Sequence, residues 1–183
     1  MSHKKISLIA LILLLASNVV FADSFLEWAV TPTRTKGVMS VSQKKYNEEC
    51  GACHFAYQPG WLPARSWEKL LNEKALVNHF GSNAELDKDT LQVIHDYAIE
   101  NAADASRYKI SRKVTAATDQ GEAPLRITEL RFIKRKHREI PEKMIKGNEQ
   151  VKLLGNCNAC HTQADKGLFD EDSVSIPNYP DYD

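Results

Sequence analysis

The chain has 183 residues, 43% of them apolar, and its 24 Lys and Arg are balanced by 24 Asp and Glu. This is the composition of an ordinary globular protein, and it excludes disordered and collagen-like chains. A formal net charge of zero also argues against a nucleic-acid-binding protein, which needs an excess of basic residues.

The first segment of the chain predicts export. A basic stretch at residues 2–5 precedes an apolar run over residues 6–16, and Val20-Phe21-Ala22 has the small-residue spacing of a cleavage site. The apolar run is shorter than the roughly 20 residues that a membrane-spanning helix requires. We therefore predict a signal peptide over residues 1–22 and no membrane span in the mature protein.

Serine residues mark the beginning of the first two helices predicted in the mature chain. Ser40 and Gln43 form a capping box for a helix that runs toward Cys50. Ser66 can cap a second helix, which we expect to continue through Ala75 and to be stopped by Gly81, just after His79.

The middle of the chain predicts two more helices and a connection. Asp87 can serve as the N-cap of a helix. The inward face of this helix carries Leu91, Ile94, His95 and Ala98. Residues 104–123 are polar and predict a linker, and a basic helix follows from about Thr128 to Arg138.

The C-terminal segment predicts one last helix and a tail. Val151 and Leu154 indicate the inward face of a helix that leads into Cys157. From Asp165 onward the chain has six acidic residues against Lys166, so we expect an extended wrap or a solvated end. Because no segment alternates like a strand for long, the predicted fold class is mainly α.

All four cysteines belong to two copies of one motif. Cys50-Gly51-Ala52-Cys53-His54 and Cys157-Asn158-Ala159-Cys160-His161 both follow the pattern C-x-x-C-H. In this pattern the two thiols form thioether bonds with the vinyl groups of a haem, and the histidine ligates the iron. The sequence therefore predicts two covalently attached haem c groups with His54 and His161 as iron ligands.

Three other uses of these cysteines fit the pattern less well. A redox dithiol needs no histidine after it. A zinc site would join two pairs that are 107 positions apart (157 minus 50), whereas zinc ribbons separate them by about 15–20 residues. Two disulfides would leave both motif histidines unexplained.

The second haem needs an axial ligand from the preceding part of the chain. After His161 the sequence contains no further histidine, methionine or cysteine. His137 is the preferred candidate, because it lies on the basic helix one turn after Ile133. The surrounding arginines and lysines suit the carboxylates of haem propionates.

Several residues remain candidates for the other axial position of the first haem. His79 follows an apolar-faced segment and is favoured over His95, which we expect to be a packed core residue. Met144 is an alternative ligand for either haem, and Met39 is a weaker one. Two histidine ligands would give a low-potential iron without an open coordination position.

This ligand set predicts a protein that transfers single electrons. The main alternative is a haem enzyme, such as a peroxidase or a reductase of small molecules, in which one haem keeps an open face. Rapid binding of carbon monoxide or cyanide would distinguish that enzyme from an electron carrier.

Several strings of the sequence resemble the bacterial dihaem cytochrome c family that is often called DHC. They are residues 49–63 (ECGACHFAYQPGWLP), 78–81 (NHFG), 126–140, 157–163 and 169–172. The strings occur in the same order as in the family, and the resemblance covers most of residues 45–178.

The resemblance implies a periplasmic electron carrier with two small helical, cytochrome c-like haem lobes and extended connecting segments. We assign these lobes to residues 23–108 and 109–183, the second of which includes the acidic tail. By the matching strings, His54 and His79 serve the first haem, and His161 and His137 serve the second.

The resemblance also implies partner proteins. Members of the family exchange electrons with a small oxygen-binding monohaem cytochrome c and with membrane cytochrome b561-type proteins. We expect redox partners of this kind and no nucleic acid. The contrast between the basic residues 126–146 and the acidic tail gives a further hypothesis, in which either segment steers docking.

Overall fold

Short helices joined by turns make up the folded part of the chain. The structure is a computed structural model that describes residues 35–182, so the predicted signal peptide lies outside the described residues. The α-helices are α3 (Lys44–Gly51), α4 (Ala64–Leu70), α5 (Glu73–Val77), α6 (Lys88–Glu100), α7 (Lys109–Ala117), α8 (Arg131–His137) and α9 (Cys157–Cys160). The 3-10 helices are η1 (Pro59–Trp61), η2 (Ile127–Glu129), η3 (Glu142–Met144), η4 (Ala164–Lys166) and η5 (Glu171–Ser173).

The prediction of a mainly α fold is confirmed. Between residues 35 and 182 the only β-type pairing consists of two isolated bridges, His79 with Ser82 and His161 with Val174. None of the helices in this range is long and apolar enough to span a membrane.

Helix α3, which carries the first half of the first motif, begins later than predicted. Gln43 occupies the N-cap in an extended conformation, and its side-chain oxygen accepts a hydrogen bond from the amide of Tyr46. The prediction of Ser40 as the cap is wrong, because the glutamine already satisfies this first-turn amide. Tyr46 is 1% exposed and packs edge-on against Trp67 and Tyr97, which fixes α3 on the core.

The single helix predicted from Ser66 to Ala75 is in fact two helices. Pro63 precedes α4, and Ser66 lies inside that helix, buried, with its amide donating to the Pro63 carbonyl at 2.9 Å. Asn72 interrupts the helix and caps α5, since its side chain accepts from the Lys74 amide at 3.0 Å. Ser66 is therefore a core residue and not a cap.

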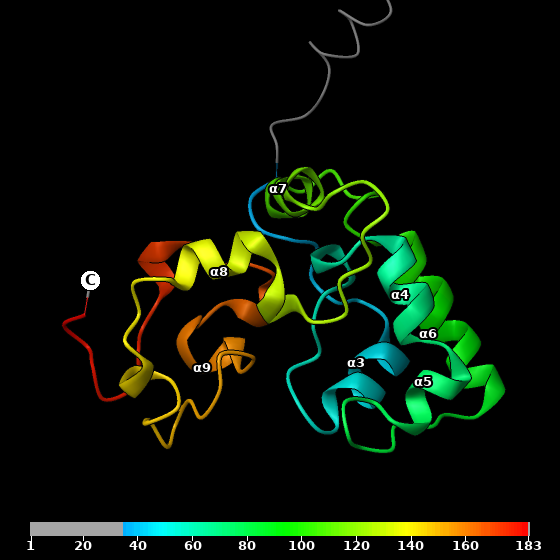
Figure 1. Cartoon of the computed structure of the whole chain (residues 1–183), viewed down its shortest axis with the longest axis horizontal. Helices are drawn as coiled ribbons and strands as arrows, with labels where there is room; N and C mark the ends of the chain where they lie inside the picture. Colours follow the sequence, from blue (N-terminus) through cyan, green and yellow to red (C-terminus); the bar gives the residue numbers. More distant parts are fainter. Residues whose placement is uncertain (1–34, 183) are drawn as a thin grey trace, which may run out of the picture. The chain divides into compact units, whose positions relative to one another are not determined.

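Helix α6 agrees with the sequence prediction. The Asp87 side chain accepts a hydrogen bond from the Thr90 amide at 3.0 Å, as an N-cap does. Ile94 and Ala98 are both 0% exposed, but Leu91 and His95 are only partly buried, so the expectation that His95 is a packed core residue is wrong. Helices α3 and α4 pack against α6, and α5 belongs to the same group (Figure 1).

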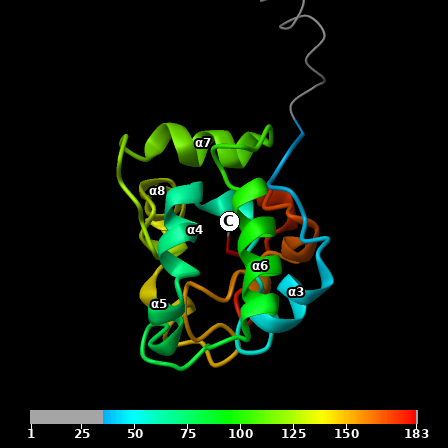
Figure 2. The same ribbon diagram turned by 90° about the vertical axis from the view of Figure 1, so that its right-hand side faces the viewer.

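The predicted linker over residues 104–123 contains a helix, α7, whose axis crosses those of α4 and α6 in Figure 2. Its buried face consists only of Ser111 and Val114, which is too narrow a face for composition alone to indicate. The amide of Ile110 donates to the Gly37 carbonyl at 2.9 Å. The predicted boundary between two lobes at residue 108 stays a prediction.

The C-terminal helices are shorter than predicted. The basic helix is divided at Leu130, whose extended ψ of 133° separates η2 from α8. The segment that leads directly into Cys157 is not helical. Lys152 has a left-handed φ of 65°, and turns connect residues 151–156. The second motif itself begins with the four-residue helix α9.

The end of the chain is an extended wrap that is held to the rest of the protein. Its Ile176 is 5% exposed, and the Asn148 side chain donates to the Pro177 carbonyl at 2.6 Å.

Two glycines allow a close contact between the beginning of the described chain and the segment after the second motif. Gly37 and Gly167, both with a φ of 74°, allow the Val38 amide to donate to the Gly167 carbonyl at 2.9 Å. A Cβ atom on Gly37 would lie 2.0 Å from that carbonyl oxygen, so this contact requires glycine.

The main hydrophobic core lies between α3, α4, α6, α7 and α8. It is built from Tyr46, Trp61, Leu62, Trp67, Ile94, Ala98, Val114, Phe132 and their neighbours. The segment after residue 138 contributes to this cluster only through the partly buried Leu154 and Phe169. The first C-x-x-C-H motif therefore adjoins the main core, whereas the second lies in a segment that contributes little to it.

Candidate haem-binding sites

The first motif lies at the C-terminal end of α3. Cys50 is half-buried in the last turn of this helix, whereas Cys53 and His54 are exposed just beyond it. The Nδ1 atom of His54 lies 2.8 Å from the Phe55 carbonyl oxygen. A hydrogen bond donated from Nδ1 leaves Nε2 as the atom that can ligate a metal.

A tight turn after α5 places His79 opposite His54. The His79 amide donates to the Ser82 carbonyl at 2.7 Å, and the turn includes Phe80 and Gly81 with φ of 54° and 101°. The ring centroids of His54 and His79 are 6.3 Å apart, and the ring planes differ by 19°. The two imidazoles are therefore nearly parallel.

The second motif begins in α9 and ends in a turn. The His161 amide donates to the Cys157 carbonyl at 2.9 Å, and the Ser175 amide donates to the Cys160 carbonyl at 2.8 Å. The ring of Phe169 packs edge-on against the His161 ring at 5.2 Å. The C-terminal segment thus contacts the second motif directly.

His137, the last residue of α8, faces His161. Its Nδ1 atom lies 2.9 Å from the Ile133 carbonyl oxygen, so a donated hydrogen bond again leaves Nε2 as the ligating atom. The two ring centroids are 6.0 Å apart, and the ring planes differ by 77°. This pair is nearly perpendicular, in contrast to the parallel pair of the first site.

Burial keeps one imidazole of each pair in the neutral form that binds metals. It lowers the pKa of His79, and His54 and Arg126 lower it further. Burial, followed by the effect of His137, lowers the pKa of His161 to about 4. The Nδ1 atom of His161 is buried without a hydrogen-bond partner.

The cysteines and the other candidate ligands do not support the alternative sites. No disulfide joins the four cysteines, and within residues 35–182 no group of three or more His, Cys, Asp or Glu is arranged to hold a metal ion. His95 lies beside Asp96, with its Nδ1 atom 3.3 Å from a carboxylate oxygen. Met39 lies in the extended lead-in, and Met144 is buried in η3.

A mainly apolar cavity lies in the segment that precedes the second motif in the chain. The cavity has a volume of about 470 Å³ and is lined by residues between Ile140 and Lys146 and between Lys152 and Leu154. Its walls include Ile140, Ile145, Leu153 and Leu154. Leu153 is 57% exposed, so it is an apolar side chain that a bound haem could cover.

Most basic side chains around α8 already have acidic partners. Arg131 pairs with Asp119 and Glu122, and Lys136 lies 2.7 Å from Glu171. Lys134 and Arg135 make no such pair among the described residues, so they are better placed to bind carboxylates of a haem. At the first site Arg126 stacks on the Phe80 ring, 3.9 Å from its centroid.

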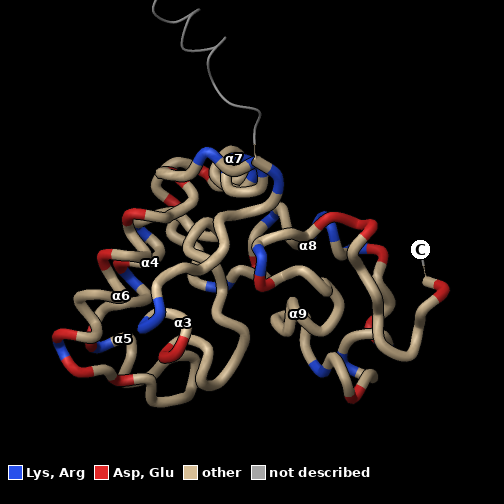
Figure 3. Tube along the Cα trace, turned by 180° about the vertical axis from the view of Figure 1, so that it is seen from behind, with Lys and Arg blue, Asp and Glu red and all other residues tan. Residues whose placement is uncertain are grey.

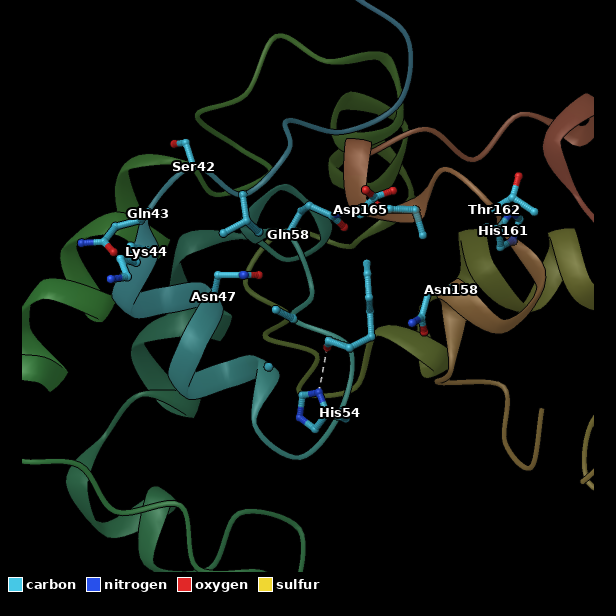
Figure 4. A pocket seen from close by; sticks show the side chains of 15 residues that line it. Ser42, Gln43, Lys44, Asn47, His54, Gln58, Asn158, His161, Thr162 and Asp165 are labelled. Carbon is cyan, nitrogen blue, oxygen red and sulfur yellow. Dashed lines mark hydrogen bonds between the residues drawn. The ribbon is translucent and has the colours of Figure 1, made fainter. Parts of the chain in front are cut away.

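A larger cavity of about 870 Å³ lies between the two motifs (Figure 4). His54 and His161 are on its walls, together with the polar side chains Gln58, Asn158 and Asp165. The cavity therefore adjoins the motif histidine of each site.

Sequence reasoning did not assign a role to several aromatic residues of the sites. Tyr57 packs against the His54 ring with centroids 5.2 Å apart, and Phe169 contacts both His161 and Trp61. Burial, followed by the effect of Cys157, raises the pKa of Tyr57 to about 12. The sequence did contain one signal for this role, because Tyr57 lies only three residues after the first motif.

Two C-x-x-C-H motifs on a helical fold, each facing a further histidine, define a c-type cytochrome with two haems. The profile of the family "Dihaem cytochrome c" matches residues 46–169. A comparison with curated proteins returned no match.

Solved structures give the same result. A dihaem cytochrome c from Shewanella baltica OS155 is 37% identical, with 76% of this chain and 97% of that chain covered and a TM-score of 0.62. A dihaem cytochrome c from Rhodobacter sphaeroides is 41% identical, with 72% and 100% covered and a TM-score of 0.63.

The chain belongs to the dihaem cytochrome c family. It binds two haem c groups covalently, in agreement with its two motifs. When bound, these groups supply reversible one-electron chemistry at iron.

Proposed function

We propose that the protein is a one-electron carrier in which two histidines ligate each iron, His54 with His79 and His161 with His137. The observation that supports this proposal is the position of a second imidazole opposite each motif histidine, at 6.3 and 6.0 Å between ring centroids. Iron with both axial positions filled by protein has no position for a substrate, so electron exchange is the chemistry that remains.

The protein orients these imidazoles through carbonyl groups. His54 is held by the Phe55 carbonyl and His137 by the Ile133 carbonyl, so each pair contains one histidine of fixed orientation. Such hydrogen bonds increase the basicity of a ligand. Two imidazoles also give a lower potential than histidine with methionine, so we infer two low-potential haems.

The proposal includes export to the periplasm and redox partners that are proteins. The predicted signal peptide and the family resemblance support these two points. A small monohaem cytochrome c and a membrane cytochrome b561-type protein are the partners that the resemblance implies.

Docking through the basic and acidic segments receives less support. The Lys136–Glu171 contact joins the two segments, so their charges partly neutralise each other, and Figure 3 shows both signs interspersed around α8. Electron exchange with the partner that does not depend on ionic strength would eliminate electrostatic docking.

Ligand-deletion variants test the proposed carrier. The ferric holoprotein is expected to be entirely low-spin in its visible and EPR spectra, and the ferrous form is expected not to bind carbon monoxide. His79→Gly and His137→Gly should each convert one haem to a high-spin form that binds carbon monoxide. His95→Gly is the matched control and should leave both spectra unchanged.

High-spin iron in the wild-type protein, with rapid binding of carbon monoxide, would contradict the proposal. That result would favour the alternative of a haem enzyme with one open site.

A further inference from the structure

Tyr57 makes a direct connection between the two motifs. Its ring lies against the imidazole of His54, with centroids 5.2 Å apart and planes inclined by 35°. Its hydroxyl group donates a hydrogen bond of 2.7 Å to the carbonyl of Gly155. This carbonyl belongs to the loop that leads into Cys157, so one side chain contacts both sites.

The connection continues into the second motif through the same carbonyl. The Gly155 oxygen also accepts a hydrogen bond from the amide of Cys157, at 2.9 Å. The route from His54 to Cys157 therefore consists of one aromatic contact and two hydrogen bonds. Cys157 is one of the two residues that attach the second haem.

The local packing requires glycine at the far end of this contact. A Cβ atom at residue 155 would lie 2.7 Å from the Tyr57 hydroxyl oxygen, where a carbon atom does not fit. Gly155 is buried and its φ is not in the left-handed region, so conformational freedom does not explain the glycine. Close approach of the tyrosine does explain it.

Other contacts determine how the two motif loops are placed. Gln58 is 1% exposed, and its side chain donates to the Ala164 carbonyl at 2.5 Å. The Ala164 amide in turn donates to the His161 carbonyl at 3.0 Å. Because Gln58 joins the loops independently, removal of the Tyr57 hydroxyl leaves their spacing supported.

We propose that Tyr57 is the bridging residue through which the two haems exchange electrons. The inference rests on the proposed function of an electron carrier. One electron leaves the ferrous iron on the His54 side, which becomes ferric, and reduces the ferric iron on the His161 side to the ferrous state. Tyr57 keeps its proton and its oxidation state. It provides only the path for the electron, through its ring contact with His54 and its hydrogen bond to Gly155.

Tyr57→Phe tests the bridge in the holoprotein. The variant keeps the ring against His54 and removes only the hydrogen bond to Gly155. A sub-stoichiometric radiolytic pulse reduces the ferric protein, and the concentration-independent absorbance phase reports exchange between the haems. We expect this rate constant to fall several-fold, while the midpoint potentials and the two low-spin EPR signals stay unchanged.

Tyr46→Phe is the matched control. It removes a buried hydroxyl group whose hydrogen bond, to the Tyr57 carbonyl, has the same length of 2.7 Å but does not lead to the second motif. We expect it to reduce thermal stability about as much as Tyr57→Phe does and to leave the exchange rate unchanged. Gly155→Ala is a second test, because it displaces the hydroxyl while Tyr57 stays in place in the sequence, and it should also slow the exchange.

Three results would overturn the bridge. The first is a wild-type exchange rate in Tyr57→Phe, and the second is an equal slowing in Tyr46→Phe. The third is a slowing that comes with shifted potentials or EPR signals, since this would mean that Tyr57 only holds the loop in position. Failure of the carrier function itself would be seen separately, as carbon monoxide binding by the wild-type protein.

Discussion

The two haem sites place the same motif and a facing histidine on different kinds of backbone. The first site lies at the end of α3, which packs on α6 in the main core. The second lies between α8 and the four-residue α9, in a segment of 3-10 helices and turns. The comparison teaches that attachment through C-x-x-C-H does not require a preformed helical core, because the cofactor itself can supply apolar surface.

Removal of the second haem is expected to have the largest effect on folding. In a Cys157→Ser/Cys160→Ser variant, residues 145–178 should lose their amide protection, because little buried surface remains there without the cofactor. Hydrogen exchange followed by mass spectrometry measures this loss. The matched variant Cys50→Ser/Cys53→Ser should lose the first haem and keep α6 protected.

The contrast between the two sites would be contradicted if both double mutants lost amide protection over the same residues. Such a result would mean that the two sites form one cooperative unit.

Disruption of the glycine contact that joins the two ends of the described chain should have the next largest effect. Gly37→Ala is expected to cost about 3 kcal/mol or more, because the new Cβ would overlap the Gly167 carbonyl in a left-handed conformation. Gly121→Ala is the control, since Gly121 also has a positive φ but has nothing within 4 Å of its Cβ position. The control should cost only about 1–2 kcal/mol, and urea unfolding of both variants gives the comparison.

The smallest expected effect concerns the acid stability of α6. The hydrogen bond from the Thr90 amide and the effect of Lys45 lower the pKa of Asp87 below its ordinary value of 3.8. The ionised carboxylate therefore stabilises the fold above that value, and the contribution disappears as the pH falls through the lower folded pKa. Asp87→Asn keeps a capping side chain and removes the charge.

This substitution should reduce the dependence of thermal stability on pH between neutrality and about pH 3, the range in which a carboxylate titrates. An unchanged pH profile in the variant would show that Asp87 contributes only its hydrogen bond.

The sequence predicted those features that depend on local chemistry. Asp87 caps its helix because the acceptor lies three residues from the amide that it satisfies, and this spacing can be read directly. The C-x-x-C-H motifs are equally local. The two covalent haems followed from these motifs, and the mainly α fold class followed from the lack of strand-like alternation.

Several features that sequence reasoning missed depend on contacts between distant residues. Ser111 in α7 is buried because Gly60 lies against it, and nothing in the polar segment around Ser111 indicates this. The bond between Tyr57 and Gly155 spans 98 positions and likewise has no local signature. The helix predicted before Cys157 fails for a related reason, since the Asn156 side chain donates to the Val151 carbonyl and closes a loop instead.

The contact between Val38 and Gly167 also constrains the order of maturation. These residues are 129 positions apart (167 minus 38), and Gly167 comes after both motifs in the chain. The amide of Val38 cannot donate this hydrogen bond until synthesis has passed the last cysteine. This long-range contact can therefore form only after both cysteine pairs have been synthesised.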